Sequence, residues 1–99
     1  MTDKTFKVYP KAEEDLTRIY QYTQQEWGAQ QAEAYIRTLH QGLMVIASNP
    51  ALGRNRDYIR PGLKAYHTGS HIVFYKSTPY GVAIVRVLHQ AMDYDRHFN

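Results

Sequence analysis

Apolar residues recur every three to four positions in the first half of this chain and form shorter, more continuous runs in the second half. The first pattern predicts two amphipathic helices, from Pro10 to Trp27 and from Ala29 to about Ala47, because residues at that spacing share one helix face. Gly28, which lies between them, is a typical helix stop. We therefore expect the two helices to pack antiparallel as a hairpin.

Each predicted helix has one face that we expect to be buried. In the first helix this face comprises Ala12, Leu16, Ile19, Tyr20, Thr23 and Trp27. In the second helix it comprises Ala32, Tyr35, Ile36, Leu39, Leu43 and Ile46. The acidic residues Glu13, Glu14 and Asp15 follow Pro10 in the first turn, where the helix dipole favours negative charge.

The shorter apolar runs predict four strands, one before the helices and three after them. These strands are Thr5 to Tyr9, Leu63 to Thr68, His71 to Ser77 and Val82 to His89. The segment from Arg54 to Arg60 is basic and irregular. This order predicts a single α+β domain over residues 1–99, in which the hairpin covers one face of a small antiparallel meander and the other face stays partly open.

The last predicted strand carries the most informative residues. It is apolar enough to lie inside a sheet, yet Arg86 lies in its middle and His89 at its end. A buried charge is costly unless it is paired or faces water. With Ile84 and Leu88 as neighbours on its face, we expect Arg86 to point to the open side of the sheet, where it either binds an acidic partner or orders the C-terminal tail.

Composition narrows the class of protein. The net charge is +3, which suits an acidic protein partner or RNA but is weaker than in a dedicated nucleic-acid binder. Nine tyrosines in 99 residues indicate either an interface or a small aromatic core. The chain has no cysteine, no signal-peptide pattern and no apolar run long enough to span a bilayer, so we expect a cytoplasmic protein without a membrane partner.

The residues favour a binding protein over an enzyme. No serine or threonine has a matching base, and no glycine-rich phosphate loop is present. His67 and His71 flank a predicted turn and are expected to be exposed there. If a helix followed the last strand, His89, Asp93 and His97 would share one face and could hold a divalent metal. A polar tail is the favoured interpretation. We therefore expect no metal and no cofactor.

Several weak motifs, in an order that spans nearly the whole chain, together resemble one family. They are Asp15-Leu-x-x-Ile-Tyr-x-Tyr22, Trp27-Gly-x-x-Gln-Ala-x-x-Tyr35, Asn49-Pro-x-x-Gly53, Arg60-x-Gly-Leu63, Gly69-x-His-x-x-Phe-Tyr75 and Ile84-Val-Arg-Val-Leu-His-x-x-Met-Asp93. The chain resembles the ParE-type toxins of the RelE/ParE toxin–antitoxin superfamily. The resemblance implies the RelE/ParE fold, in agreement with the element order above.

The resemblance also implies a function and partners. ParE toxins inhibit DNA gyrase and arrest growth, and a small acidic antitoxin neutralises them and makes most of the contacts to operator DNA. The implied gyrase-binding residues are Arg60, Arg86, His89, Asp93, Tyr94 and His97. The expected antitoxin-binding residues are Tyr20, Tyr22, Tyr35, Tyr75 and Arg86.

Two alternatives stay open. The related RelE toxins cleave mRNA on the ribosome, and such a ribonuclease would use Arg60, Arg86, His89 and Tyr94 here. This chain lacks their dense cluster of basic residues, which disfavours that activity. A third possibility is a member of the family that has lost toxicity and only binds the antitoxin.

Overall fold

The computed structural model describes residues 5–92 and 94–98, without the side chains of Tyr94 and Asp95. Its helices and strands follow the predicted order, with three short additions. The elements are β1 (Thr5–Val8), α1 (Pro10–Trp27), α2 (Ala29–Ser48), the short 3₁₀ helix η1 (Pro50–Leu52), β2 (Arg54–Asn55), β3 (Leu63–Thr68), β4 (His71–Thr78), β5 (Gly81–His89) and α3 (Tyr94–Phe98).

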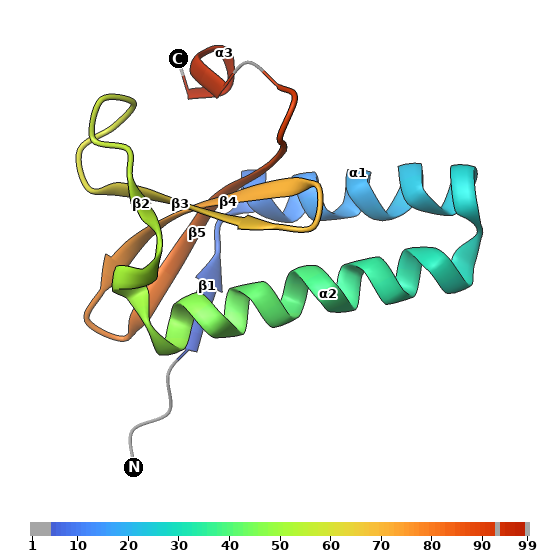
Figure 1. The fold of residues 1–99 in the computed structure, drawn as a ribbon, viewed down its shortest axis with the longest axis horizontal. Helices are drawn as coiled ribbons and strands as arrows, with labels where there is room; N and C mark the ends of the chain where they lie inside the picture. Colours follow the sequence, from blue (N-terminus) through green and yellow to red (C-terminus); the bar gives the residue numbers. More distant parts are fainter. Residues whose placement is uncertain (1–4, 93, 99) are drawn as a thin grey trace.

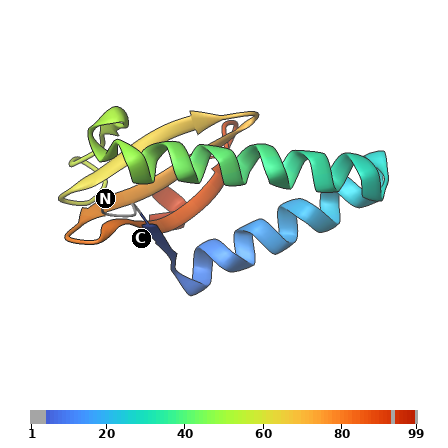
Figure 2. The ribbon, with the colours of Figure 1, turned by 90° about the horizontal axis from the view of Figure 1, so that it is seen from below.

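The five strands form one sheet in the order β1-β5-β4-β3-β2. The strand β1 runs parallel to β5, and the other neighbours are antiparallel. The hairpin of α1 and α2 lies along one face, and its tip projects beyond the sheet (Figures 1 and 2). The predicted α+β fold is thus confirmed. None of the helices in the described ranges has the length and apolar character that crossing a membrane requires.

The main core fills the space between the hairpin and the sheet. Its buried residues are Ala12, Leu43, Ile46, Ala47, Val73, Tyr75, Val82, Ile84 and Val87. The residues of both predicted helix faces are buried or partly buried except at one position. Trp27, which we expected to be buried, is 70% exposed because it lies at the hairpin tip, beyond the sheet that would cover it.

The opposite face of the sheet is covered, which corrects the expectation of a partly open face. A second buried cluster contains Leu63, Ala65, Phe74, Val85 and Leu88. Phe98 of α3 and Ile59 of the β2–β3 loop pack against it, and the Phe98 and Phe74 rings meet edge to face at 5.0 Å. Figure 1 shows α3 and this loop at the same end of the sheet.

A β-bulge in β5 explains how both clusters draw on one strand. Phe74 pairs with Arg86, but the next residue, Tyr75, pairs with Ile84, so Val85 is an extra residue on β5. After such an insertion the alternation of faces changes. Ile84 therefore belongs to the main core and Leu88 to the second cluster. Arg86, which pairs with Phe74, therefore shares a face with Leu88 as expected, but the expectation that it also shares a face with Ile84 is wrong.

Tyr75 anchors the segment that leads from α2 to β2. Its hydroxyl donates to the Pro50 carbonyl at 2.7 Å and accepts from the Gly53 amide at 2.8 Å. A side chain at Gly53 would strike the Tyr75 ring. Burial raises the pKa of the Tyr75 hydroxyl, so it stays protonated and can donate. Tyr75 is fully buried, so it offers a partner no surface in this chain.

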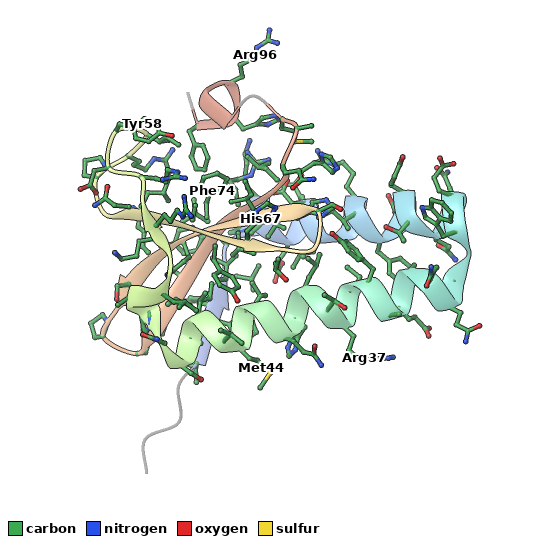
Figure 3. All side chains as sticks on the ribbon, in the orientation of Figure 1. Arg37, Met44, Tyr58, His67, Phe74 and Arg96 are labelled. Carbon is green, nitrogen blue, oxygen red and sulfur yellow. The ribbon has the colours of Figure 1, made fainter. Side chains whose placement is uncertain are left out.

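The substitution Tyr75→Phe should therefore destabilise the fold. It removes two hydrogen bonds and leaves two partly buried backbone groups without these partners, which should lower the free energy of unfolding by about 1–3 kcal/mol. Urea denaturation measures this value. The matched control is Tyr58→Phe at a side chain that is 75% exposed (labelled in Figure 3), which should change nothing measurable. Equal stability of the two variants would contradict the anchoring role.

Candidate functional site

The free half of β5 is bound by a side chain of α1. The strand β1 pairs with Gly81 to Ile84 only, so the outer edge of β5 beyond Ile84 has no neighbouring strand. There the side chain of Asp15 takes the place of a neighbouring strand. It accepts hydrogen bonds from Arg86 Nε and Nη2, both at 2.8 Å, and from the Val87 amide at 3.0 Å.

Asp15 and Arg86 form a bidentate ion pair that is almost entirely buried. Asp15 is 5% exposed and Arg86 is 8% exposed. The hydrogen bonds that Arg86 donates to Asp15 raise the pKa of Arg86, against the opposing effect of burial. The expectation that Arg86 faces an open side and binds an acidic partner is wrong, because its acidic partner belongs to this chain. The sequence does not point to Asp15 as the partner of Arg86, because the helix dipole is enough to explain an acidic residue in the first helical turn.

Arg86 and Arg60 also hold the C-terminal helix. Arg86 Nη1 donates to the His97 carbonyl at 3.1 Å, and Arg60 Nη2 donates to the Phe98 carbonyl at 3.3 Å. The Arg60 guanidinium additionally lies 5.2 Å from the centre of the Phe98 ring. The last carbonyls of a helix have no partners within the helix, and cations stabilise that end. Ordering of the tail by Arg86, the other role expected for it, agrees with this geometry.

The loop that presents Arg60 is itself ordered. Asp57 accepts hydrogen bonds from the Asn55 side-chain amide and from the Gly62 backbone amide, both at 2.9 Å. These bonds lower the pKa of the Asp57 carboxyl. The Arg56 amide also donates to the Leu63 carbonyl at 2.8 Å. The segment after Arg54 is therefore only partly irregular, since β2 and these contacts fix its course.

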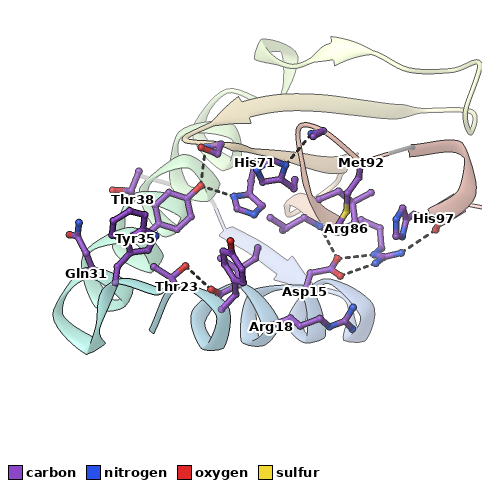
Figure 4. A pocket seen from close by; sticks show the side chains of 18 of the residues that line it. Asp15, Arg18, Thr23, Gln31, Tyr35, Thr38, His71, Arg86, Met92 and His97 are labelled. Carbon is purple, nitrogen blue, oxygen red and sulfur yellow. Dashed lines mark hydrogen bonds and ion pairs between the residues drawn. The ribbon is translucent and has the colours of Figure 1, made fainter. Parts of the chain in front are cut away.

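A groove of about 920 Å³ lies beside the Asp15–Arg86 pair, between the hairpin and the free edge of β5 (Figure 4). Side chains of α1 and α2 form its walls, and β5 and the segment after it form its floor. Three residues with large apolar side chains are exposed along it, namely Tyr22 at 64%, Trp27 at 70% and Met92 at 44%. Such side chains are typical of binding surfaces, since they lose much apolar area to water when a partner covers them.

A tyrosine and two histidines close one end of the groove. Tyr35 accepts a hydrogen bond from the Ser70 amide at 2.9 Å, and its hydroxyl lies 2.6 Å from His71 Nδ1. The His71 ring meets the His89 ring edge to face at 5.3 Å, and His89 Nδ1 accepts from the Ala91 amide at 3.1 Å. Burial and the neighbouring His89 lower the pKa of His71 to about 4. The expectation of an exposed His71 is therefore wrong.

The predicted site residues gather around the groove and α3, with exceptions. Tyr22, Tyr35, Arg86, His89 and His97 line the groove. Arg60 packs against Phe98 of α3, Tyr20 is half-buried and Tyr75 lies in the core. Asp93 and the side chain of Tyr94 lie outside the described residues. The idea of one helical face through His89 and His97 is wrong, because β5 continues to His89 and α3 begins at Tyr94.

Both arginines of the predicted site are engaged within the chain. Arg60 and Arg86 already donate to carbonyl groups and to Asp15, so neither guanidinium is fully available to a phosphate. Within residues 5–92 and 94–98, no three or more histidine, aspartate or glutamate side chains are grouped so that they could hold a metal ion. A two-layer domain with exposed aromatic side chains along a groove is typical of a partner-binding protein.

Comparison with known proteins agrees with this class and identifies the family. Residues 6–94 match the family described as the ParE toxin of the type II toxin–antitoxin system parDE, and the chain belongs to this family. Toxin ParE1 of Mycobacterium tuberculosis is 45% identical over 89 residues, which cover 89% of this chain and 91% of the relative. Toxin ParE1 of Caulobacter vibrioides is 37% identical over 94 residues, which cover 95% and 97%.

A solved structure shows the same fold. It is titled as the chromosomal ParDE toxin–antitoxin system from P. aeruginosa, and it superposes with a TM-score of 0.75 over 88% of this chain and 96% of that chain. The sequence identity is only 17%, so this likeness speaks for the fold alone.

Removing either member of the Asp15–Arg86 pair should be strongly destabilising. Asp15→Asn leaves a buried cation uncompensated, which should cost about 3–5 kcal/mol of unfolding free energy. The double variant Asp15→Leu with Arg86→Met should lose less than the sum of the single variants, since it removes both charges. Chemical denaturation measures each value. The matched control Glu26→Gln, at an exposed carboxylate of α1, should stay within about 0.5 kcal/mol.

The His71 pKa predicts a pH dependence of stability. In the unfolded state His71 takes up a proton below about pH 6.5. In the folded state it does so only near pH 4. The contribution of His71 to stability is therefore complete above pH 6.5 and is lost as the pH falls toward 4. NMR titration of the His71 ring should give a midpoint near pH 4, far below the ordinary histidine value of about 6.5. The variant His71→Asn should lose less stability between pH 6.5 and 4 than the unaltered chain, and equal losses would contradict this assignment.

Proposed function

We propose that this toxin inhibits DNA gyrase by direct binding and that a cognate acidic antitoxin neutralises it. Membership of the ParE family supports the toxin half of the statement. The gyrase target and the neutralisation are the proposed steps. Under this proposal the chain acts in the cytoplasm, arrests growth when it is unopposed, and contacts operator DNA only through the antitoxin.

The groove beside Asp15 supports an antitoxin site. Its exposed Tyr22, Trp27 and Met92 offer apolar area, and Arg18 adds a cation to its wall. Asp15, the carboxylate that lines the groove, is neutralised by Arg86. An acidic segment that orders on binding fits such a surface, because it can bury apolar side chains and match the positive charge.

The engagement of both arginines is the observation that favours gyrase binding over ribonuclease activity. Cleavage of the RelE type needs cations that are free to stabilise charge developing on a phosphate. Here Arg86 is held by Asp15 and the His97 carbonyl, and Arg60 is held at Phe98. In the gyrase complex these two arginines then act by positioning the tail. The exposed side chain of His97 is available for direct contact, together with His89 at the groove.

Paired assays test the target. Purified protein is added to a gyrase supercoiling reaction and to a cell-free translation reaction. We expect inhibited supercoiling and intact mRNA. We expect a short reading frame that encodes the acidic antitoxin to lie beside the one for this chain, and its product should restore supercoiling. His97→Ala should weaken inhibition about tenfold if His97 is a principal contact.

The matched control is Arg37→Ala, at a side chain that points away from the sheet on the outer surface of α2 (Figure 3). This variant should inhibit gyrase as the unaltered chain does. Messenger RNA that is cut only when ribosomes are present would instead establish the ribonuclease. No effect in either reaction, together with no growth arrest on expression, would establish a non-toxic antitoxin-binding protein.

A further inference from the structure

Charge is segregated between the two layers of the fold. The helices α1 and α2 carry five acidic residues and three cations, whereas residues 54–92, which contain β2 to β5, carry six cations and a single acidic residue, Asp57. One of these cations, Arg86, is neutralised by Asp15 of α1. The modest net charge of +3 is therefore the sum of an acidic helical layer and a basic sheet. Such a concentration of charge attracts a partner of opposite sign to one layer.

Two lysines lie on the sheet face that the helical hairpin does not cover. Phe6 and Val8 pack against the main core, so Lys7 between them points to the other face. Tyr75 belongs to the main core as well, so Lys76 beside it on β4 also points to the other face.

The strand register brings these two lysines into one row. Ala83 of β5 pairs with Lys7 on one side and with Lys76 on the other. Neighbouring strands are about 4.8 Å apart, so the backbones of the two lysines are about 10 Å apart. Ala83 is fully buried and has the smallest side chain that a strand can place between them. Nothing on the central strand therefore keeps a ligand away from the two ammonium groups.

The neighbouring row of the sheet adds hydroxyl groups. Gly81 of β5 pairs with Thr5 of β1 and with Thr78 of β4. Thr5 Oγ1 donates to the Tyr80 carbonyl at 3.2 Å. Thr78 Oγ1 accepts from the Gly81 amide at 3.1 Å, and no described residue accepts its own proton. We name the surface made by these two rows the lysine face; its residues are Thr5, Lys7, Lys76, Thr78, Gly81 and Ala83.

The two lysines are available to a ligand. The one ion pair within residues 5–92 and 94–98 joins Asp15 and Arg86, so neither Lys7 nor Lys76 has a carboxylate partner there. Lys7 is exposed and Lys76 is half-buried. Figure 1 shows α3 at the top of the molecule and the β4–β5 turn, beside the lysine face, at the lower left. The C-terminal helix therefore leaves this end of the sheet open.

The composition of the lysine face favours a phosphate backbone over an acidic protein surface. None of its six residues has a large apolar side chain, and protein interfaces depend on such anchors. Lysine ammonium groups and threonine hydroxyls are typical contacts to DNA phosphates. Duplex DNA carries about one negative charge per 1.7 Å of its axis, which is the densest anion that the target of a gyrase inhibitor presents.

We propose that the lysine face binds the sugar–phosphate backbone of the duplex DNA that gyrase holds, with Lys7 and Lys76 as phosphate contacts. This inference rests on the proposed function, because it takes gyrase as the target. It goes further by adding a DNA contact that is separate from the C-terminal tail. Phosphate contacts carry no sequence information, so recognition of operator DNA stays with the antitoxin.

Binding of the chain to a short fluorescein-labelled duplex tests these contacts directly. Fluorescence anisotropy gives Kd at several salt concentrations between about 50 and 200 mM. The double variant Lys7→Gln with Lys76→Gln removes two phosphate contacts, so the slope of log Kd against log salt should fall by about 2. At the lowest salt its Kd should be at least about tenfold higher than that of the unaltered chain.

Two further double variants serve as matched controls. Lys11→Gln with Arg37→Gln changes the net charge equally at exposed positions of α1 and α2, and its salt slope should match that of the unaltered chain. Lys7→Arg with Lys76→Arg keeps both charges and should bind the duplex normally. If circular dichroism shows that the glutamine variant of the lysine face is unfolded, Lys7→Gln alone replaces it and should lower the slope by about 1.

The affinity of the chain for gyrase, measured with and without the duplex, tests the source of the DNA. For the unaltered chain the duplex should tighten binding at least about fivefold, because a second contact is then made within the same complex. The variant Lys7→Gln with Lys76→Gln should bind gyrase alone as the unaltered chain does, and the duplex should add nothing.

The outcomes separate the two proposals. Equal salt slopes for the glutamine variants of the lysine face and of the helices would overturn the DNA contact and leave the proposed function standing. The same holds if the duplex does not change the gyrase affinity of the unaltered chain. Weaker binding of the Lys7 and Lys76 variant to gyrase without DNA would show that these lysines contact the enzyme itself, which also overturns the inference. Failure of the unaltered chain to bind gyrase in either condition would contradict both proposals.

Discussion

The ion pair between Asp15 and Arg86 is the constraint on which the rest of the structure depends. The strand β1 is too short to cover β5, so half of a central strand would have an unpaired edge inside the protein. Asp15 satisfies the Val87 amide and at the same time neutralises Arg86. A single carboxylate thus fixes α1 against the sheet and allows a charged residue to lie within it. Burying such a pair is costly, and only its full hydrogen bonding offsets that cost.

The same pair links the core to the C-terminal tail. Arg86 Nη1 donates to the His97 carbonyl, and Arg60 Nη2 donates to the Phe98 carbonyl. Phe98 then packs on Phe74 and closes the second face of the sheet. A change at Asp15 therefore affects α1, β5 and α3 together.

The fold was largely predictable from the sequence because local patterns determine it. The spacing of apolar residues placed both helices and β3 to β5 to within one residue, and Gly28 marked the hairpin turn. Trp27 was misplaced because helical periodicity says which face is apolar and says nothing about where the sheet ends. The strand β2 has only two residues, too few for any periodic pattern.

The candidate site was less predictable because it depends on contacts between distant residues. The bulge at Val85 moves Arg86 off the face that strict alternation assigns to it, and no turn residue or glycine announces that insertion. Asp15 is 71 residues from Arg86 in the sequence. An acidic residue in a first helical turn already has a local explanation, so the sequence gives no reason to seek a distant partner. Tyr75 and Tyr35 look alike in sequence, and only the packing separates an anchor in the core from a wall of the groove.

The exposed aromatic side chains of the groove add nothing to the thin core of this small domain, so the position of the groove needs a physical reason. The groove lies beside side-chain hydrogen bonds of Asp15, Tyr35 and His71, which fix α1, α2 and the β3–β4 turn. A partner that binds there meets a surface that is already ordered. The entropy lost on association then falls mainly on the partner's flexible segment. This is the division expected when a folded toxin is recognised by an antitoxin segment that orders only on binding.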